Sequence, residues 1–261
     1  MTGIRMGYAD TSRGQVHYAE CGSGTPVMLL HQTPRSWDEY REVLPLLGRT
    51  HRAIAMDTIG FGGSAPIAEH SIENYAAVVV EFLDALGLER TTLVGHHTGG
   101  VVAIEVAARA PDRVERLVVS STPYVDAAAR EMRRGRPPID HVEIDPDGGH
   151  LTELWRRRRD FYPTDRPDLF TRLVRDALQV GADVEKGHEA VGRYRMEDRI
   201  GLVGCPVLCI GASADPFSFP ELTSLSSRFN SATVAVIGGG MVPLMEMYPS
   251  EVVELIARFA S

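Results

Sequence analysis

Short, unbroken runs of apolar residues recur along the chain, separated by stretches with a helical pattern. Runs without polar alternation are typical of parallel strands buried on both faces of a sheet. Each run therefore predicts a central strand: Val27 to Leu30, Ala53 to Met56, Leu93 to Val94, Leu117 to Val119, Val207 to Ile210 and Val234 to Ile237. The segment from Tyr8 to Cys21 instead alternates polar and apolar residues around Ser12-Arg13-Gly14, which predicts an antiparallel hairpin.

Amphipathic stretches between these runs predict helices. The clearest begins after Ser71, a residue type that caps helix N-termini, and ends at Gly87, a residue type that terminates them. Further helices are expected from Gly99 to Ala110 and from Ser250 onward. The order predicts an α/β fold, a doubly wound and mostly parallel sheet of about eight strands.

The alternation stops between about Pro123 and Ile200, where no convincing strand pattern appears. We interpret this segment as a helical insertion that covers the sheet. The expected organisation is a core formed by residues 1–122 and 201–261 and a helical cap formed by residues 123–200.

Composition and charge exclude several classes of protein. The chain has 261 residues, is 44% hydrophobic and carries 27 Lys and Arg against 35 Asp and Glu, a formal charge of −8. This balance disfavours nucleic-acid and membrane-surface binding. No apolar run approaches the roughly 18 residues of a membrane span. We expect a cytoplasmic protein, a monomer or homodimer, with a small-molecule partner, no nucleic acid and no membrane.

The segment Leu93-Val94-Gly95-His96-His97-Thr98-Gly99-Gly100 runs from a predicted strand through a glycine-flanked turn into a helix. This arrangement is that of a nucleophile elbow, in which the central side chain is exposed at the carboxyl end of the sheet. The central residue is His97.

Together with other motifs, the elbow resembles that of the α/β-hydrolase superfamily, in its cap-domain form. Two more segments carry the resemblance, Leu29-Leu30-His31-Gln32-Thr33-Pro34-Arg35-Ser36-Trp37 and Asp57-Thr58-Ile59-Gly60-Phe61-Gly62-Gly63-Ser64. The resemblance implies that the backbone N–H groups of Thr33 and Thr98 form an oxyanion hole. It also implies that Asp215, in Gly211-Ala212-Ser213-Ala214-Asp215-Pro216, is the catalytic acid.

The chain departs from this family at two catalytic positions. His97 replaces the Ser, Cys or Asp of the elbow, and Met241 replaces the late histidine. A serine-based acyl-enzyme mechanism is therefore excluded at these positions. Because imidazole reaches farther than a serine hydroxyl, we expect His97 to approach Asp215 and form an acid/base dyad, with Asp215 orienting the ring.

Other residues complete the expected site. The cap histidines His141, His150 and His188 remain alternative bases. The substrate pocket is expected to be apolar and to include the residues Gln32, Trp37, Tyr124, Trp155, Phe217 and Met241. We expect no cofactor and no metal, since no carboxylate spacing near His96 and His97 indicates a metal site.

Three functions follow from these residues. The first is a cofactor-independent, non-hydrolytic enzyme of specialised metabolism, such as antibiotic biosynthesis. It would act on a largely apolar, aromatic or polyketide-derived molecule by addition, cyclisation, lyase or carbon–carbon bond chemistry. The second is a serine-free hydrolase of an ester or lactone in which His97 activates water. The third is a ligand-binding protein without turnover.

Overall fold

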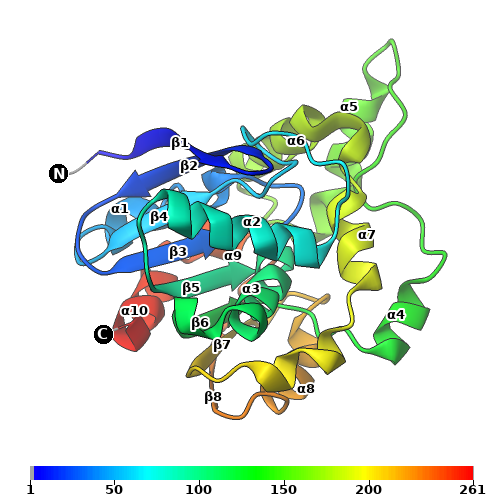
Figure 1. The fold of residues 1–261 in the computed structure, drawn as a ribbon. Helices are drawn as coiled ribbons and strands as arrows, with labels where there is room; N and C mark the ends of the chain where they lie inside the picture. The colour runs from blue at the N-terminus through cyan, green and yellow to red at the C-terminus, as the bar shows by residue number, and fades with distance from the viewer. Residues whose placement is uncertain (1–2, 261) are drawn as a thin grey trace.

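An eight-stranded sheet forms the centre of the molecule (Figure 1) in the computed structural model, which describes residues 3–260. The strand order is β1-β2-β4-β3-β5-β6-β7-β8. The strands are β1 (Arg5–Thr11), β2 (Gly14–Cys21), β3 (Pro26–Leu30), β4 (Arg52–Met56), β5 (Thr91–His96), β6 (Val114–Ser120), β7 (Val207–Ala212) and β8 (Ala232–Ile237). β1 and β2 form the expected hairpin, β2 pairs antiparallel with β4, and the other pairs are parallel. The predicted α/β fold is confirmed.

Helices cover both faces of the sheet. Apolar side chains of α2 and α3 belong to one buried cluster, and those of α1 and α10 belong to a second cluster on the opposite face. The α-helices of the core are α1 (Val43–Leu47), α2 (Ile72–Ala85), α3 (Thr98–Arg109), α8 (Leu222–Ser226), α9 (Leu244–Met247) and α10 (Pro249–Ala260). Short 3-10 turns are η1 (Trp37–Tyr40), η2 (Pro111–Arg113), η3 (Arg159–Phe161), η4 (Gly181–Asp183), η5 (Met196–Asp198), η6 (Ile200–Leu202) and η7 (Phe219–Glu221).

Local chemistry accounts for the limits of α2. Ser71 is the N-cap residue, and its hydroxyl accepts a hydrogen bond from the backbone N–H of Asn74 at 3.2 Å. Gly87, just after the helix, has a φ of +65°, a conformation that glycine adopts without a steric penalty. The predicted start and end of this helix are confirmed.

The last strand differs from the sequence prediction of a strand buried on both faces. Val234 and Val236 are 48% and 53% exposed. β8 pairs with β7 and forms the edge of the sheet. An apolar run does not distinguish a central strand from an edge strand, because strand order is a property of the whole sheet.

The segment between β6 and β7 contains helices and 3-10 turns and no strand, as its sequence indicates. Its helices are α4 (Ala127–Arg133), α5 (Gly149–Arg158), α6 (Pro167–Val180) and α7 (Lys186–Arg193). They lie over one end of the sheet (Figure 1) and are called the cap below. The exact domain limits, residues 123 and 200, stay a prediction. No helix within residues 3–260 is both long and apolar enough to cross a membrane.

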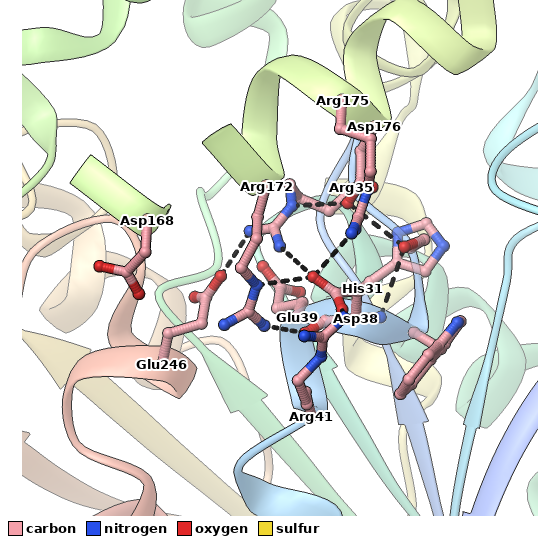
Figure 2. A network of polar contacts seen from close by, with 12 residues as sticks. His31, Arg35, Asp38, Glu39, Arg41, Asp168, Arg172, Arg175, Asp176 and Glu246 are labelled. Atoms are coloured by element: carbon pink, nitrogen blue, oxygen red, sulfur yellow. Dashed lines mark hydrogen bonds and ion pairs between the residues drawn. The ribbon is translucent and has the colours of Figure 1, made fainter. Parts of the chain in front are cut away.

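A buried charge network joins the cap to the core (Figure 2). Arg35, which is fully buried, forms ion pairs with Asp176 of α6 at 2.9 Å and with Glu246 of α9 at 2.5 Å. Arg172 of α6 forms an ion pair with Asp38 at 2.6 Å. These contacts position the cap over the carboxyl ends of the strands.

Candidate active site

His97 lies at a sharp turn between β5 and α3. Its φ and ψ are 46° and −114°, a conformation that non-glycine residues rarely adopt. Two glycines make the turn sterically feasible. A Cβ atom at Gly95 would collide with the backbone of Gly99, and a Cβ atom at Gly99 would collide with the carbonyl oxygen of Leu30. The strand, turn and helix therefore hold the imidazole at the carboxyl end of the sheet.

Asp215 approaches this imidazole from the loop after β7. The distance from His97 Nε2 to Asp215 Oδ2 is 2.9 Å, and the His97 side chain is 13% exposed. This distance is within ion-pair range when the ring is protonated, but the contact lacks the geometry of a hydrogen bond. The other ring nitrogen, Nδ1, is left for chemistry in the pocket that His97 lines.

Asp215 is buried and held in place by its own loop. Oδ2 accepts a hydrogen bond from the Ser218 hydroxyl at 2.6 Å, and Oδ1 accepts one from the Phe217 N–H at 2.9 Å. Burial by itself would raise the pKa of Asp215, but the neighbouring His97 and the hydrogen bonds from Ser218 and the Phe217 N–H lower it below its ordinary value. Asp215 is therefore an anion at neutral pH.

Thr33 and Thr98 lie side by side next to His97. Their hydroxyl oxygens are 2.9 Å apart, and both residues are buried. Neither backbone N–H has a hydrogen-bond partner within residues 3–260. Thr98 is also the first residue of α3, so its N–H lies at the end of the helix where the dipole favours a negative charge. The two residues expected to form an oxyanion hole are thus in contact through their side chains, and their backbone N–H groups are free to donate.

Glu39 is a further residue at the site that the sequence analysis missed. It accepts hydrogen bonds from the backbone N–H of Gln32 at 2.9 Å and from the Gln32 carboxamide at 2.5 Å. Gln32 lines the pocket, so Glu39 orients a residue of the oxyanion segment. Burial and the neighbouring Glu246 raise the pKa of Glu39 to about 8. Nothing in the segment Trp37-Asp38-Glu39-Tyr40 distinguishes Glu39 from a solvated acid.

A pocket of about 1470 Å³ lies between the cap and the core. Gln32, Thr33, His97, Thr98 and Phe217 are among the residues that line it. The lining therefore brings together both expected oxyanion residues, the elbow histidine and two of the six expected pocket residues.

The other four expected pocket residues lie elsewhere. Trp37 lines a separate cleft of about 180 Å³ beside Asp57. Tyr124 is buried in the main core, and Met241 is outside the pocket lining. Trp155 stacks on a second aromatic ring of the cap, with the ring centroids 4.7 Å apart. The aromatic residues of the cap mainly pack against one another in its interior. Sequence spacing does not distinguish such residues from residues that line a pocket.

The lining is also more charged than the sequence analysis predicts. Phe161 and Phe217 are the aromatic side chains in it, apart from histidines. Charged side chains are more numerous, namely Arg130, Arg133, Arg134, Arg136, Arg156, Arg157, Arg158, Arg193, Glu143, Glu153, Glu185, Glu189 and Glu221. The surface of the pocket is nevertheless more apolar than polar, so the cap adds charged groups to a pocket that is mainly apolar, as expected.

The cap histidines have partners of their own. His188 Nε2 lies 2.9 Å from Asp140 Oδ2, and His141 Nε2 lies 3.1 Å from Glu143 Oε1. His150 accepts a hydrogen bond from a backbone N–H and does not line the pocket. None of these contacts involves His97 or Asp215.

Comparison with known proteins identifies the family to which this chain belongs. A family profile described as "alpha/beta hydrolase fold" matches residues 25–182, more than half of the chain. The chain belongs to the α/β hydrolase fold family. It is also similar to haloalkane dehalogenase 2 of Mycobacterium tuberculosis (strain ATCC 25618 / H37Rv), with 33% identity over 140 residues. The match covers 51% of this chain and 49% of the dehalogenase, so the chain spans about half the length of that relative.

Solved structures resemble nearly the whole chain. One is a thermophilic esterase from Thermogutta terrifontis, with a TM-score of 0.79 and 21% identity, covering 98% of this chain and 97% of the esterase. Another is Est816, described as an N-acyl homoserine lactone degrading enzyme, with a TM-score of 0.78 and 22% identity, covering 97% of this chain and 100% of Est816. At this level of identity the likeness shows the fold.

This α/β hydrolase fold protein has a second histidine at its elbow, and its contacts indicate a structural role. His96 Nε2 donates to the carbonyl oxygen of Val242 at 3.0 Å, and His96 Nδ1 lies 3.2 Å from the Ser120 hydroxyl. Burial and the neighbouring His97 lower the pKa of His96 to about 3. His96 is therefore neutral and anchors the loop that follows Met241.

Proposed function

We propose that the protein hydrolyses a carboxylic ester or lactone by means of water activated by His97. The observation that carries this proposal is the 2.9 Å contact between His97 and Asp215 beside the two free backbone N–H groups. A base and a pair of oxyanion donors are the parts that attack of water on a carbonyl group requires.

In the proposed mechanism, the carbonyl oxygen of the substrate accepts hydrogen bonds from the Thr33 and Thr98 amides. His97 Nδ1 takes a proton from water as the water oxygen bonds to the carbonyl carbon. Asp215 stabilises the imidazolium that forms. When the tetrahedral intermediate collapses, the carbon–oxygen bond to the leaving group breaks, and His97 returns its proton to the leaving alkoxide. The products are an acid and an alcohol, or a hydroxy acid from a lactone.

The similar proteins support hydrolysis over the other candidates. One similar structure is named an esterase and another a lactone-degrading enzyme. The proposal accounts for the loss of the serine, because water replaces the enzyme nucleophile and one histidine then suffices as base.

Turnover in heavy-oxygen water tests the proposal. The purified protein is assayed with a panel of esters and lactones in H₂¹⁸O, and the products are analysed by mass spectrometry. One ¹⁸O atom should enter the acid product. His97→Gln, which removes the base, should lower kcat by about 100- to 10,000-fold. Asp215→Asn should lower it as well. His150→Gln is the matched control outside the pocket and should retain activity.

A non-hydrolytic acid/base reaction at the same site is the second candidate. The observation that favours it is the absence of Ser, Cys or Asp at position 97 together with Met241 in place of the late histidine. A product without ¹⁸O that still requires His97 would replace hydrolysis by this candidate. Tight ligand binding without product, unchanged in His97→Gln, would replace both by a binding protein.

A further inference from the structure

We propose that the substrate carries a carboxylate group, remote from the reacting carbonyl, and that Arg133 binds this carboxylate at the cap side of the pocket. The inference rests on the proposed function and names the substrate class of the same site. Four observations support it: an unpaired guanidinium group, its contrast with neighbouring arginines, the position of Glu221, and the charge of the pocket.

Arg133 is the last residue of α4, which lies beside α7 in the cap (Figure 1). Its side chain lines the pocket that contains His97. Its Nη1 atom is buried and has no hydrogen-bond partner within residues 3–260. A buried donor of a charged group is unfavourable without a partner, so such groups usually have an acceptor.

The other arginines of the pocket already have acceptors. Arg130 and Arg158 form ion pairs at 2.5 Å with Glu197 and Asp140. Further pairs are Arg134 with Glu131, Arg156 and Arg157 with Glu153, and Arg193 with Glu189. Arg136 donates to the carbonyl oxygen of Met132 and is exposed. Among the pocket arginines within residues 3–260, Arg133 is therefore the half-buried one that has a buried nitrogen atom and no acceptor.

Glu221 lines the same pocket and its charge acts on Arg133, but no ion pair joins the two residues within residues 3–260. The Glu221 carboxylate accepts a hydrogen bond from the backbone N–H of Tyr124 at 2.8 Å. Burial lowers the pKa of Arg133, Glu221 opposes this shift, and Arg136 adds to it. The guanidinium remains charged at neutral pH and keeps a donor for a ligand.

The charges around the pocket leave Arg133 as the group that can attract an anion. Eight arginines and five glutamates line the pocket. Acids outside the lining pair with Arg130, Arg134 and Arg158, so these arginines add no free positive charge. A carboxylate fits better than a phosphate dianion, because one unpaired guanidinium balances one charge and its planar fork matches the two oxygens of a carboxylate.

A pair of esters that differ in one charge tests the inference. Monomethyl esters of glutarate, adipate and suberate each have one ester and one carboxylate, whereas the dimethyl esters have none. The wild-type enzyme should prefer at least one monomethyl ester over its dimethyl counterpart. Arg133→Met should lower kcat/KM for that monomethyl ester by about 10- to 100-fold, mainly through KM, and leave the dimethyl ester nearly unchanged.

Arg136→Met is the matched control, because Arg136 lines the same pocket but its side chain is exposed. It should leave the preference for the monomethyl ester intact. Equal losses for both esters in Arg133→Met, or no preference in the wild type, would overturn the inference while ester hydrolysis by His97 stands.

Binding separates this inference from the proposed function. The diacids glutarate, adipate and suberate are titrated into the wild-type protein and both variants by calorimetry. At least one should bind the wild type and Arg136→Met about 10-fold or more tightly than it binds Arg133→Met. If no ester is hydrolysed but this difference is found, the proposed function fails and the carboxylate site stands. Equal binding to all three proteins, or no binding, would overturn the site.

Discussion

Glu39 shows how a single side chain gains its chemistry from its surroundings. Two hydrogen bonds from Gln32 hold its carboxyl group, and burial together with Glu246 raises its pKa to about 8. Glu39 is therefore largely protonated at neutral pH. Its proton needs an acceptor, and Glu246 Oε2 is a buried acceptor in the same network with no partner within residues 3–260.

The pKa of Glu39 predicts a specific dependence of stability on pH. In the unfolded chain this group ionises near its ordinary value of 4.5, whereas in the folded protein it keeps its proton up to about pH 8. The folded state binds more protons in this window, so the contribution of Glu39 to the free energy of unfolding falls as pH rises from about 4.5 to about 8. Glu39→Gln removes this contribution.

Urea unfolding of the wild type and Glu39→Gln at about pH 5, 6.5 and 8 measures the effect. The stability of Glu39→Gln relative to the wild type should increase with pH by about 1 kcal/mol or more across the window. A difference between the two proteins that does not change with pH would show that Glu39 ionises normally.

The elbow shows what an element requires of its sequence. The crossing of β5, α3 and β3 leaves no room for a side chain at position 99, where a Cβ atom would collide with the carbonyl oxygen of Leu30. This obstacle is backbone, which cannot rotate away as a flexible side chain does. The close approach also places Thr98 in contact with Thr33, whose hydroxyl oxygen is 2.9 Å from that of Thr98.

Gly99→Ala should therefore destabilise the protein by about 1–3 kcal/mol or more. The crowded backbone has to move, and activity should fall because the oxyanion donors move with it. Gly204→Ala is the matched control, since a Cβ atom at this exposed position meets nothing within 4 Å. Chemical denaturation measures both changes. Similar stabilities for the two variants would contradict the packing argument.

At the scale of the whole molecule, one buried network connects cap and core. Arg35 lies between Asp176 of the cap and Glu246 of the core, and Arg172 reaches from the cap to Asp38. Such a network adds little stability when complete, because burying charges is costly. Removing one charged residue from the network is costly, because its former partners stay buried without an opposite charge.

Arg35→Met should lower the free energy of unfolding by about 3–5 kcal/mol, because it leaves Asp176 and Glu246 without their buried cation. Arg41→Met is the matched control. Arg41 also forms an ion pair with an acid of this network, Asp38, but its side chain is 47% exposed, so the loss should be about 1 kcal/mol or less. Equal losses in thermal or urea unfolding would show that burial does not determine the contribution of these pairs.

The sequence by itself determined the strands, the main helices and the elbow of this protein. Ser71 and Gly87 mark the ends of a helix, and Gly95 and Gly99 mark a tight turn around His97. These features depend on periodicity and backbone sterics among close neighbours in the chain, so residue order reveals them. The family resemblance also identified Asp215, which the fold brings to His97.

The tertiary structure alone decided which side chains share an environment. It placed Trp155 against another aromatic ring of the cap and Glu39 within hydrogen-bond distance of Gln32. It also placed Arg133 at the pocket, where its Nη1 atom has no acceptor within residues 3–260. Burial, ion pairing and pKa values depend on groups that approach from distant segments. Sequence spacing does not encode these approaches, because they arise from the packing of the cap on the sheet.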